Sequence, residues 1–293
     1  MGHVDLNILF WANVVVTAIG VVCLLGCATW LVRSGEWRAP LAMVPRPTGG
    51  LGVIHALAIL LGFQAALILA AGVYRGLAPG AAGEPIRPGS SLWHAIMLIG
   101  SGLHVCFAVA AGWILRRRPS FPPQPEHRGV TAPVALGLAL VASLAIVPVA
   151  AAQLNFGRVL WTLIHPDQSA PTHDVLDALQ GSAWGAWGAF WLTVAATITT
   201  PLYEELAFRG LLLGALYRVL GGAWPAIILS AVLFGFVHAQ PQDVLPLITF
   251  GVVLGYLRLR TRSLSVCVLT HALFNARTMT FAILNPEVVT AGF

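Results

Sequence analysis

Charged residues are scarce in this sequence: they make up 9% of the 293 residues, whereas hydrophobic residues make up 58%. A soluble globular domain carries about 25% charged residues. A surface so poor in charge would not stay dissolved in water, so the composition excludes a soluble enzyme, a disordered chain, a coiled coil and a nucleic-acid-binding protein. The class that remains is a polytopic membrane protein, whose first partner is the lipid bilayer.

Lysine is absent, so all 16 basic residues are arginine, and the formal net charge is +5. The arginines are spread thinly, which indicates membrane topology rather than a binding patch for nucleic acid. Cysteine is rare as well. Cys23, Cys27, Cys106 and Cys267 lie inside apolar runs and show no metal-ligand spacing, so we interpret them as small apolar residues without a disulfide framework.

Eight apolar runs come close to the length that a membrane-crossing helix needs, about 20 mostly apolar residues. Their apolar character is continuous, whereas the strands of a β-barrel alternate between apolar and polar residues. We therefore predict an all-α fold, a polytopic membrane bundle of about eight transmembrane helices. The predicted spans are residues 6–32, 51–74, 91–115, 131–152, 182–200, 224–239, 242–258 and 264–284.

Arginine-rich segments between the spans predict the orientation, because basic loops stay in the cytoplasm. These segments are residues 33–46, 116–128 and 258–262. Segment 153–180 carries three aspartates and one arginine, so we expect it outside. Both termini are then outside, provided that residues 182–220 cross the membrane once, with a bend at Thr200-Pro201.

The Arg- and Pro-rich segment that ends at residue 130 marks the best boundary in the chain. Residues 1–130 are predicted to form an accessory N-terminal membrane segment of three transmembrane helices, and residues 131–293 the core. The apolar runs of the first part hold no acidic residue, and His55, His94 and His104 share no spacing. A lone histidine in a membrane is more often an interhelical hydrogen-bonding residue than a ligand.

Two acidic residues, Glu204 and Glu205, lie deep in an apolar run. Burying a carboxylate in a membrane is costly, so such residues usually have a function and a partner. Arg209 follows Glu205 by four residues, so the two share a helix face and can form an ion pair. Glu204 lies about 100° further round the helix and does not face Arg209. We therefore expect Glu205 to be structural and Glu204 to be the candidate general base.

Two further polar sites follow at His238 and at His271 with Asn275. At a rise of 1.5 Å per residue, Glu204 and His238 each lie about 21 Å from the inner ends of their helices. By the same measure His271 and Asn275, which are four residues apart and share a face, lie about 10 and 17 Å from theirs. The four side chains are therefore predicted to converge in an intramembrane polar cavity.

Two kinds of chemistry fit this set of residues. Glu204 and His238 can activate water for attack on an amide, while His271 and Asn275 donate hydrogen bonds to the developing oxyanion. Alternatively, Glu204, His238 and His271 can hold Zn²⁺ with an open fourth position, as in catalytic zinc sites. The sequence does not separate these alternatives.

The set of motifs resembles that of the CAAX prenyl protease 2 and bacteriocin-processing (CPBP) family of intramembrane proteases, over about residues 131–284. The family patterns are Glu-Glu-xxx-Arg, Phe-xxx-His and His-xxx-Asn/Asp. In this sequence they are Glu204-Glu205-Leu-Ala-Phe-Arg209, Phe234-Gly-Phe-Val-His238 and His271-Ala-Leu-Phe-Asn275.

The resemblance implies an eight-helix bundle with a conical cavity open toward the cytoplasm. It implies that Glu204 and His238 activate the water, that His271 and Asn275 stabilise the oxyanion, and that Glu205, Arg209 and Phe234 have supporting roles. Members of the family have been described both as metalloproteases and as glutamate-type proteases, so Zn²⁺ and a metal-free mechanism are equally open.

We therefore predict an intramembrane endopeptidase of the bacterial inner membrane, acting on a peptide or protein substrate that is lipidated or membrane-bound. One alternative is a non-catalytic immunity or scaffold protein that keeps the family fold. A proton or cation transporter that uses Glu204 is disfavoured, because no chain of acidic residues links the two faces. Arg277, deep in the last span, is expected to pair with a backbone carbonyl or Glu205, or else to anchor a substrate carboxylate.

Overall fold

The computed structural model of the protein describes residues 6–36, 41, 44, 46–78, 86–121, 130–168, 174–180, 183–238 and 240–284. Every regular element in these residues is helical, which confirms the all-α prediction. Within the same residues, six helices are long and apolar enough to cross a membrane, so the chain is a multi-pass membrane protein. They are α1 (Leu6–Arg33), α2 (Val53–Leu77), α3 (Ser91–Arg117), α4 (Ala132–Ile164), α10 (Val244–Thr261) and α11 (Leu264–Leu284).

The other two predicted spans correspond to shorter elements. The run at 224–239 forms α9 (Ala223–Phe236), which has 14 residues. The run that starts at 182 becomes part of a longer helical path, residues 185–220, in which five segments follow one another without a gap. These segments are α6 (Gly185–Val194), the π-helix η1 (Ala195–Thr199), α7 (Thr200–Glu205), the π-helix η2 (Leu206–Leu212) and α8 (Leu213–Leu220).

The π-helix η1 ends one residue before the Thr200-Pro201 pair, where the sequence predicts a bend. Proline lacks a backbone N–H and its ring clashes with the carbonyl four residues earlier, so a regular α-helix is disrupted there. A π-helical turn widens the hydrogen-bond register and is a common way for a helix to absorb such a disruption. The path ends where Gly221 adopts a left-handed conformation (φ 74°), which a residue without Cβ accepts freely.

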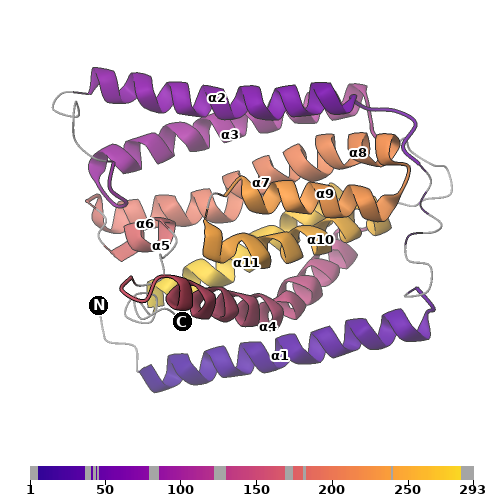
Figure 1. Cartoon of the computed structure of the whole chain (residues 1–293), viewed down its shortest axis with the longest axis horizontal. Helices are drawn as coiled ribbons and strands as arrows, with labels where there is room; N and C mark the ends of the chain where they lie inside the picture. The colour runs from indigo at the N-terminus through magenta and orange to yellow at the C-terminus, as the bar shows by residue number, and fades with distance from the viewer. Residues whose placement is uncertain are drawn as a thin grey trace.

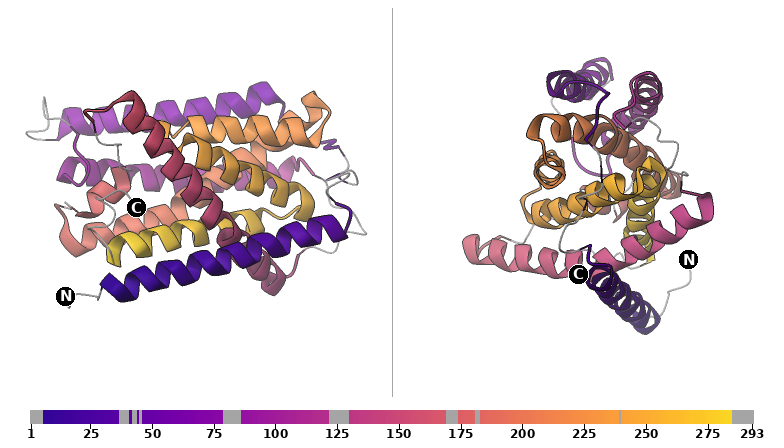
Figure 2. Two further views of the ribbon diagram at one scale, coloured as in Figure 1. Left: turned by 60° about the horizontal axis from the view of Figure 1, so that its bottom comes forward. Right: turned by 90° about the vertical axis from the view of Figure 1, so that its right-hand side faces the viewer.

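The helices lie in successive layers (Figure 1). The α2–α3 hairpin forms one side, and the path from α6 to α8 lies beneath it. Helices α9, α10 and α11 follow, then α4 crosses them obliquely, and α1 packs on α4 at the far side. The end-on view in Figure 2 shows the same order, with α1 and the α2–α3 hairpin on opposite sides of the bundle. The short helix α5 (Asp174–Gln180) packs beside α6, and the turn η3 (Pro241–Asp243) precedes α10.

Helix α4 is longer than the sequence predicts. The predicted span ends at residue 152, but the helix continues to Ile164, so the prediction of a loop from residue 153 is wrong. The residues beyond 152 include Phe156, Val159 and Leu160, which are exposed apolar side chains on a continuing helix. Arg158, which we took as a loop residue, lies within this extension. A single charged residue does not end a helix when the residues that follow it are mostly apolar and contain no proline before the helix end.

Segments from residues 1–130 contact the rest of the bundle at several points. At the end of α8, the Tyr217 hydroxyl donates to the Val44 carbonyl (2.8 Å), and Arg46 Nε donates to the Gly221 carbonyl (3.1 Å). At the end of α10, Arg260 lies 3.5 Å from Glu36. The division of the chain at residue 130 remains a prediction, and these contacts hold the two parts together.

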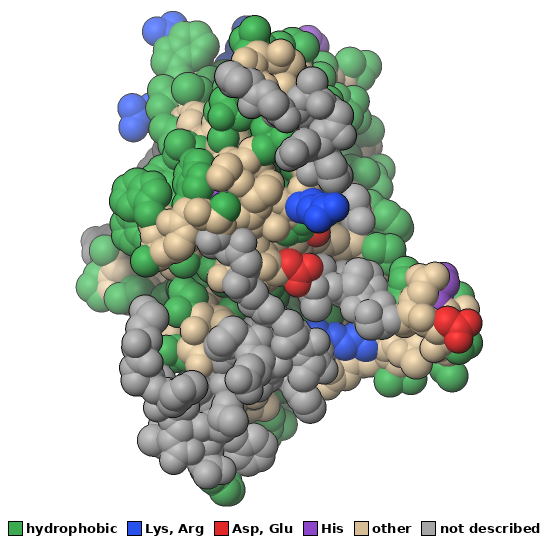
Figure 3. Space-filling model, turned by 90° about the vertical axis from the view of Figure 1, so that its left-hand side faces the viewer, with side chains coloured by type: hydrophobic (Ala, Val, Ile, Leu, Met, Phe, Trp, Pro, Cys, Tyr) green, Lys and Arg blue, Asp and Glu red, His purple; other side chains and the backbone are tan. Residues whose placement is uncertain are grey.

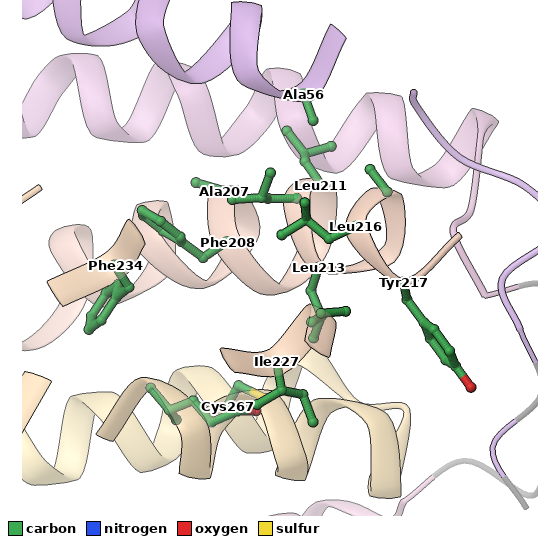
Figure 4. Packing of buried hydrophobic residues seen from close by; sticks show 14 of the residues in the cluster. Ala56, Ala207, Phe208, Leu211, Leu213, Leu216, Tyr217, Ile227, Phe234 and Cys267 are labelled. Atoms are coloured by element: carbon green, nitrogen blue, oxygen red, sulfur yellow. The ribbon is translucent and has the colours of Figure 1, made fainter. Parts of the chain in front are cut away.

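The main apolar core lies between the hairpin, the η2–α8 segment and the helices that follow. Figure 4 shows Ala56 of α2 beside the side chains of η2, with Ile227 of α9 and Cys267 of α11 on the other side. On the outside, the long helices carry exposed hydrophobic side chains along their flanks, among them Ile68, Val109 and Leu163, whereas the end of the bundle in Figure 3 shows red and blue charged side chains among the green hydrophobic ones. This distribution suits a protein whose solvent is lipid on its flanks.

Glycines allow α9 and α10 to approach closely. A Cβ added at Gly251 would lie 2.9 Å from the Ala231 Cβ, and one added at Gly255 would lie 3.0 Å from Ile227 Cγ2. Small residues at helix interfaces are typical of membrane bundles, in which close backbone packing replaces hydrophobic segregation. The backbone carbonyl of Gly251 is thereby exposed to the buried polar site described below.

Gly251→Ala is expected to lower the free energy of unfolding by about 1–3 kcal/mol, because the added methyl overpacks a tight interface. The measurement is an unfolding titration in mixed detergent micelles. Gly62→Ala in α2 is the matched control, because a Cβ there has nothing within 4 Å and alanine favours the helix. Equal stability of the two variants would contradict this description of the interface.

Candidate active site

Helix α7 carries Glu204 and Glu205 into the interior of the bundle. Their exposed fractions are 9% and 0%. Because successive helical residues differ by about 100° in direction, the two carboxylates face different neighbours. Glu205 faces Arg209 and α11, while Glu204 faces His238, in the turn after α9, and His271 on α11.

The Glu205–Arg209 ion pair is confirmed, with Arg209 Nη1 2.9 Å from Glu205 Oε1. The arginine is 1% exposed. Its Nη2 donates to the Gly251 carbonyl (3.2 Å), and its guanidinium lies 4.5 Å from the centre of the Phe234 ring. Phe234 thus supports the ion pair through a cation–π contact. Buried ions need this degree of compensation, because the cost of removing them from water is large.

His271 makes a contact that sequence reasoning missed. Its Nδ1 lies 2.9 Å from Glu205 Oε1, the same oxygen that accepts from Arg209. A carboxylate accepts hydrogen bonds, so His271 Nδ1 is the donor, and Nε2 of the neutral ring is then an acceptor. Glu205 therefore sets both the orientation and the tautomer of His271, as an orienting carboxylate does for the histidine of a catalytic triad.

His238 is oriented in the same way by a backbone group. Its Nδ1 donates to the Phe234 carbonyl at 2.8 Å. The Nε2 atom of the neutral ring is therefore an acceptor and points away from that carbonyl. The two Nε2 atoms face Glu204: that of His238 lies 3.6 Å from Oε1, and that of His271 lies 3.7 Å from Oε2. The His238 side chain is 20% exposed, which makes it the most accessible of the three.

This arrangement places hydrogen-bond acceptors opposite one another. The distances of 3.6 and 3.7 Å exceed those of direct hydrogen bonds, and Glu204 Oε2 is buried without a hydrogen-bond partner. Buried unsatisfied acceptors are rare and are often found at functional sites. The group can therefore receive protons from a bound molecule, and water or a substrate amide would satisfy it.

Glu204, His238 and His271 are the residues that the sequence offers as ligands of a metal ion. In the ranges described above, no group of three or more His, Cys, Asp or Glu side chains is arranged to hold a metal ion. The two imidazoles face different oxygens of Glu204. The Zn²⁺ set of Glu204, His238 and His271 stays a prediction.

Asn275 and Arg277 have partners outside this cluster. Asn275 Nδ2 donates to the Ala196 carbonyl in η1 at 2.8 Å, so the residue ties α11 to the π-helical segment rather than to the glutamates. Arg277 Nη2 donates to Asn13 Oδ1 on α1 at 2.6 Å. This partner differs from the Glu205 carboxylate and the backbone carbonyl that we expected for Arg277. The sequence contains no signal that indicates Asn13.

Comparison with known proteins agrees with this geometry. Residues 186–277 match a family model described as type II CAAX prenyl endopeptidase Rce1-like. This segment contains all the residues of the three motifs, so the predicted resemblance to the CPBP family is confirmed over residues 186–277.

A similar protein is "Putative membrane peptidase YdiL" of Bacillus subtilis (strain 168), which is 29% identical over 108 residues. The match covers 37% of this chain and 41% of that protein, so the chain spans about two fifths of the length of the relative it matches. No solved structure matches the chain.

Arg209→Met is expected to destabilise the protein by about 3–5 kcal/mol, because it leaves the Glu205 carboxylate buried and without its ion-pair partner. Adding Glu205→Gln to Arg209→Met should recover part of this loss. The measurement is the same unfolding titration in mixed micelles.

Arg260→Met provides a matched control at an exposed ion pair, since the Arg260 side chain is 47% exposed and lies 3.5 Å from Glu36. Its effect should stay below about 1 kcal/mol. If Arg209→Met were no more destabilising than Arg260→Met, the buried ion pair would not have the structural role described.

Proposed function

We propose that the protein is an intramembrane endopeptidase that hydrolyses a peptide bond with a water molecule activated by Glu204 and His238. The observation that carries this proposal is the buried Glu204 carboxylate faced by the Nε2 atoms of two oriented histidines, at 3.6 and 3.7 Å. The family match of residues 186–277 to an endopeptidase family supports the reaction class.

Glu204 and His238 are the proton acceptors in this mechanism. A water molecule bound to them loses a proton as its oxygen attacks the carbonyl carbon of the scissile bond. The proton is then delivered to the amide nitrogen as the C–N bond breaks. The products are a carboxylic acid and an amine, and no covalent bond to the enzyme forms. The orientation of His238 by the Phe234 carbonyl directs its Nε2 toward this water.

His271 and Asn275 are assigned to the oxyanion that develops on the carbonyl oxygen. In the neutral ring described above, His271 Nε2 is an acceptor. It donates to the oxyanion only when the ring binds a second proton, so that Nδ1 donates to Glu205 and Nε2 to the oxyanion. The Glu205 carboxylate stabilises the positive charge on that ring. The Asn275 amide uses one N–H for the Ala196 carbonyl, and its second N–H can donate to the oxyanion. One helical turn separates the two residues on α11.

The substrate that suits this site is a peptide or protein that is lipidated or otherwise bound to the membrane. The motif residues lie on helices of a bundle whose outer surface is apolar, so the scissile bond must be brought close to the bilayer. We place the protein in the inner membrane of a bacterium, which agrees with the bacterial source of the similar peptidase.

Glu204→Gln and His238→Gln should each lower kcat/KM for peptide cleavage by about 10²–10⁴-fold, the contribution typical of general acid–base catalysis. Glutamine keeps the size of the glutamate side chain but does not accept the proton. The measurement is cleavage of a quenched fluorescent peptide library, prenylated peptides included, by purified protein in detergent. A parallel series with a chelator determines whether a metal takes part.

Glu36→Gln is the matched control, because Glu36 pairs with the half-exposed Arg260 at the end of the bundle and lies outside the site. This variant should cleave like the wild type. A folded Glu204→Gln protein with full activity would contradict the proposal. A wild type that cleaves none of the peptides would favour the alternative of a non-catalytic immunity or scaffold protein.

A further inference from the structure

Tyr203, the residue directly before Glu204, packs against the α2–α3 hairpin. It is 4% exposed. Its ring is surrounded by three others: Phe63 of α2 at 4.8 Å, His104 of α3 at 4.4 Å and Phe107 of α3 at 5.0 Å between centroids. The Tyr203 hydroxyl also accepts a hydrogen bond from Gln64 Nε2 at 3.4 Å. In the described part of the chain, these ring and hydrogen-bond partners of Tyr203 all lie before residue 130.

His104 makes the most regular of these contacts. Its ring is stacked on the Tyr203 ring with an interplanar angle of 3°. The His104 Nδ1 atom is buried and has no hydrogen-bond partner. The contact therefore depends on the face of the imidazole ring rather than on its hydrogen bonding, and a phenyl ring could replace it.

The helix that carries Glu204 depends on such lateral contacts. Helix α7 has only six residues, and a π-helix precedes and follows it. A π-helix has a wider register than an α-helix and occurs as a local irregularity, often at functional sites. The neighbouring turns therefore constrain α7 less than a continuous α-helix would, and its position is set by what packs on its sides.

Three consecutive residues hold α7 from three directions, because each is rotated by about 100° from the last. Tyr203 contacts the α2–α3 hairpin, Glu204 faces the two imidazoles, and Glu205 binds Arg209 and His271. Among the described residues, the ring and hydrogen-bond contacts that join this triplet to the N-terminal part of the chain are those of Tyr203. A shift of the Tyr203 ring would move its backbone and, with it, the Glu204 carboxylate.

We propose that His104 and Phe63 are positioning residues, which hold Tyr203 and through it set the place of Glu204 relative to His238 and His271. The effect on catalysis rests on the function proposed above. Helices α2 and α3 thereby have a role in the active site, although they lie outside the segment that matches the family model.

His104→Ala should lower kcat for peptide cleavage by about 10–100-fold with KM changed less than about twofold. A displaced catalytic group acts on the transition state rather than on substrate binding. His104→Phe should restore kcat to within about threefold of the wild type, because it keeps the stacked ring. Phe63→Leu keeps apolar bulk without the ring, should lower kcat in the same way, and serves as the second variant if His104→Ala does not fold.

His94→Ala is the matched control. His94 is a fully buried histidine on the same helix, stacked at 4.9 Å on Trp184 rather than on Tyr203. It should lose stability without the selective loss of kcat. Equal loss of kcat in His94→Ala and His104→Ala, or no rescue by His104→Phe, would overturn the proposal and leave α3 with a general packing role.

Hydrogen–deuterium exchange separates this proposal from the proposed function, because it needs no substrate. The amides of residue 200 and residues 202–205 should exchange at least about tenfold faster in His104→Ala and Phe63→Leu than in the wild type, and should be unchanged in His94→Ala and His104→Phe. Unchanged exchange at these amides in His104→Ala would overturn the positioning role even if the wild type is an active peptidase. The predicted exchange pattern in a protein without peptidase activity would uphold the positioning contact and favour the non-catalytic alternative to the proposed function.

Discussion

A fully buried carboxylate, Glu205, is the constraint around which the site is assembled. Its charge has to be compensated inside a bundle that offers little water, and one oxygen receives both Arg209 and His271 at 2.9 Å. Arg209 in turn reaches the Gly251 carbonyl of α10 and the ring of Phe234 on α9. The contacts that compensate the Glu205 charge therefore connect five elements: α7, η2, α9, α10 and α11.

The consequence for chemistry is that two adjacent glutamates have different roles. Glu205 Oε1 accepts from both Arg209 and His271, whereas its Oε2 is buried without a hydrogen-bond partner. The ion pair with Arg209 compensates the charge of Glu205, so this residue is suited to orient His271 rather than to react. Glu204 is rotated by one residue, has an oxygen without a hydrogen-bond partner, and faces two imidazole nitrogens whose other ring nitrogens are already occupied. A group that is held in place but lacks a proton donor is suited to accept a proton from water.

Contacts set by a single helix could be predicted from the sequence. The depth of the polar residues also predicted that Glu204, His238 and His271 converge, but not which atoms meet between the helices. The Glu205–Arg209 pair follows from a spacing of four residues, and the apolar runs predicted where the helices lie. The Glu205–His271 bond depends on how far α11 is rotated toward α7, and no spacing within one helix contains that information. The same holds for the Asn275–Ala196 and Arg277–Asn13 contacts.

Helix length and backbone irregularity could not be predicted from the pattern of apolar and charged residues either. The extension of α4 to Ile164 was missed because we took Arg158 and the following aspartates as the mark of a loop. Pro201 predicted a disruption, but not that π-helices would lie on both sides of α7. The role of α2 and α3 was missed because the aromatic residues around Tyr203 are ordinary membrane residues in sequence and become a cluster only in the fold.

A single-turnover cleavage in H₂¹⁸O, with enzyme in excess over a cleaved peptide, tests the central claim most directly. If Glu204 and His238 activate water, the new carboxyl group of the product contains one ¹⁸O atom in the first turnover. If a carboxylate of the enzyme attacked the peptide bond itself and water then opened the resulting anhydride at the carboxyl carbon of the enzyme, the first product would carry an unlabelled oxygen from the protein. An unlabelled product would contradict the activation of water by Glu204 and His238.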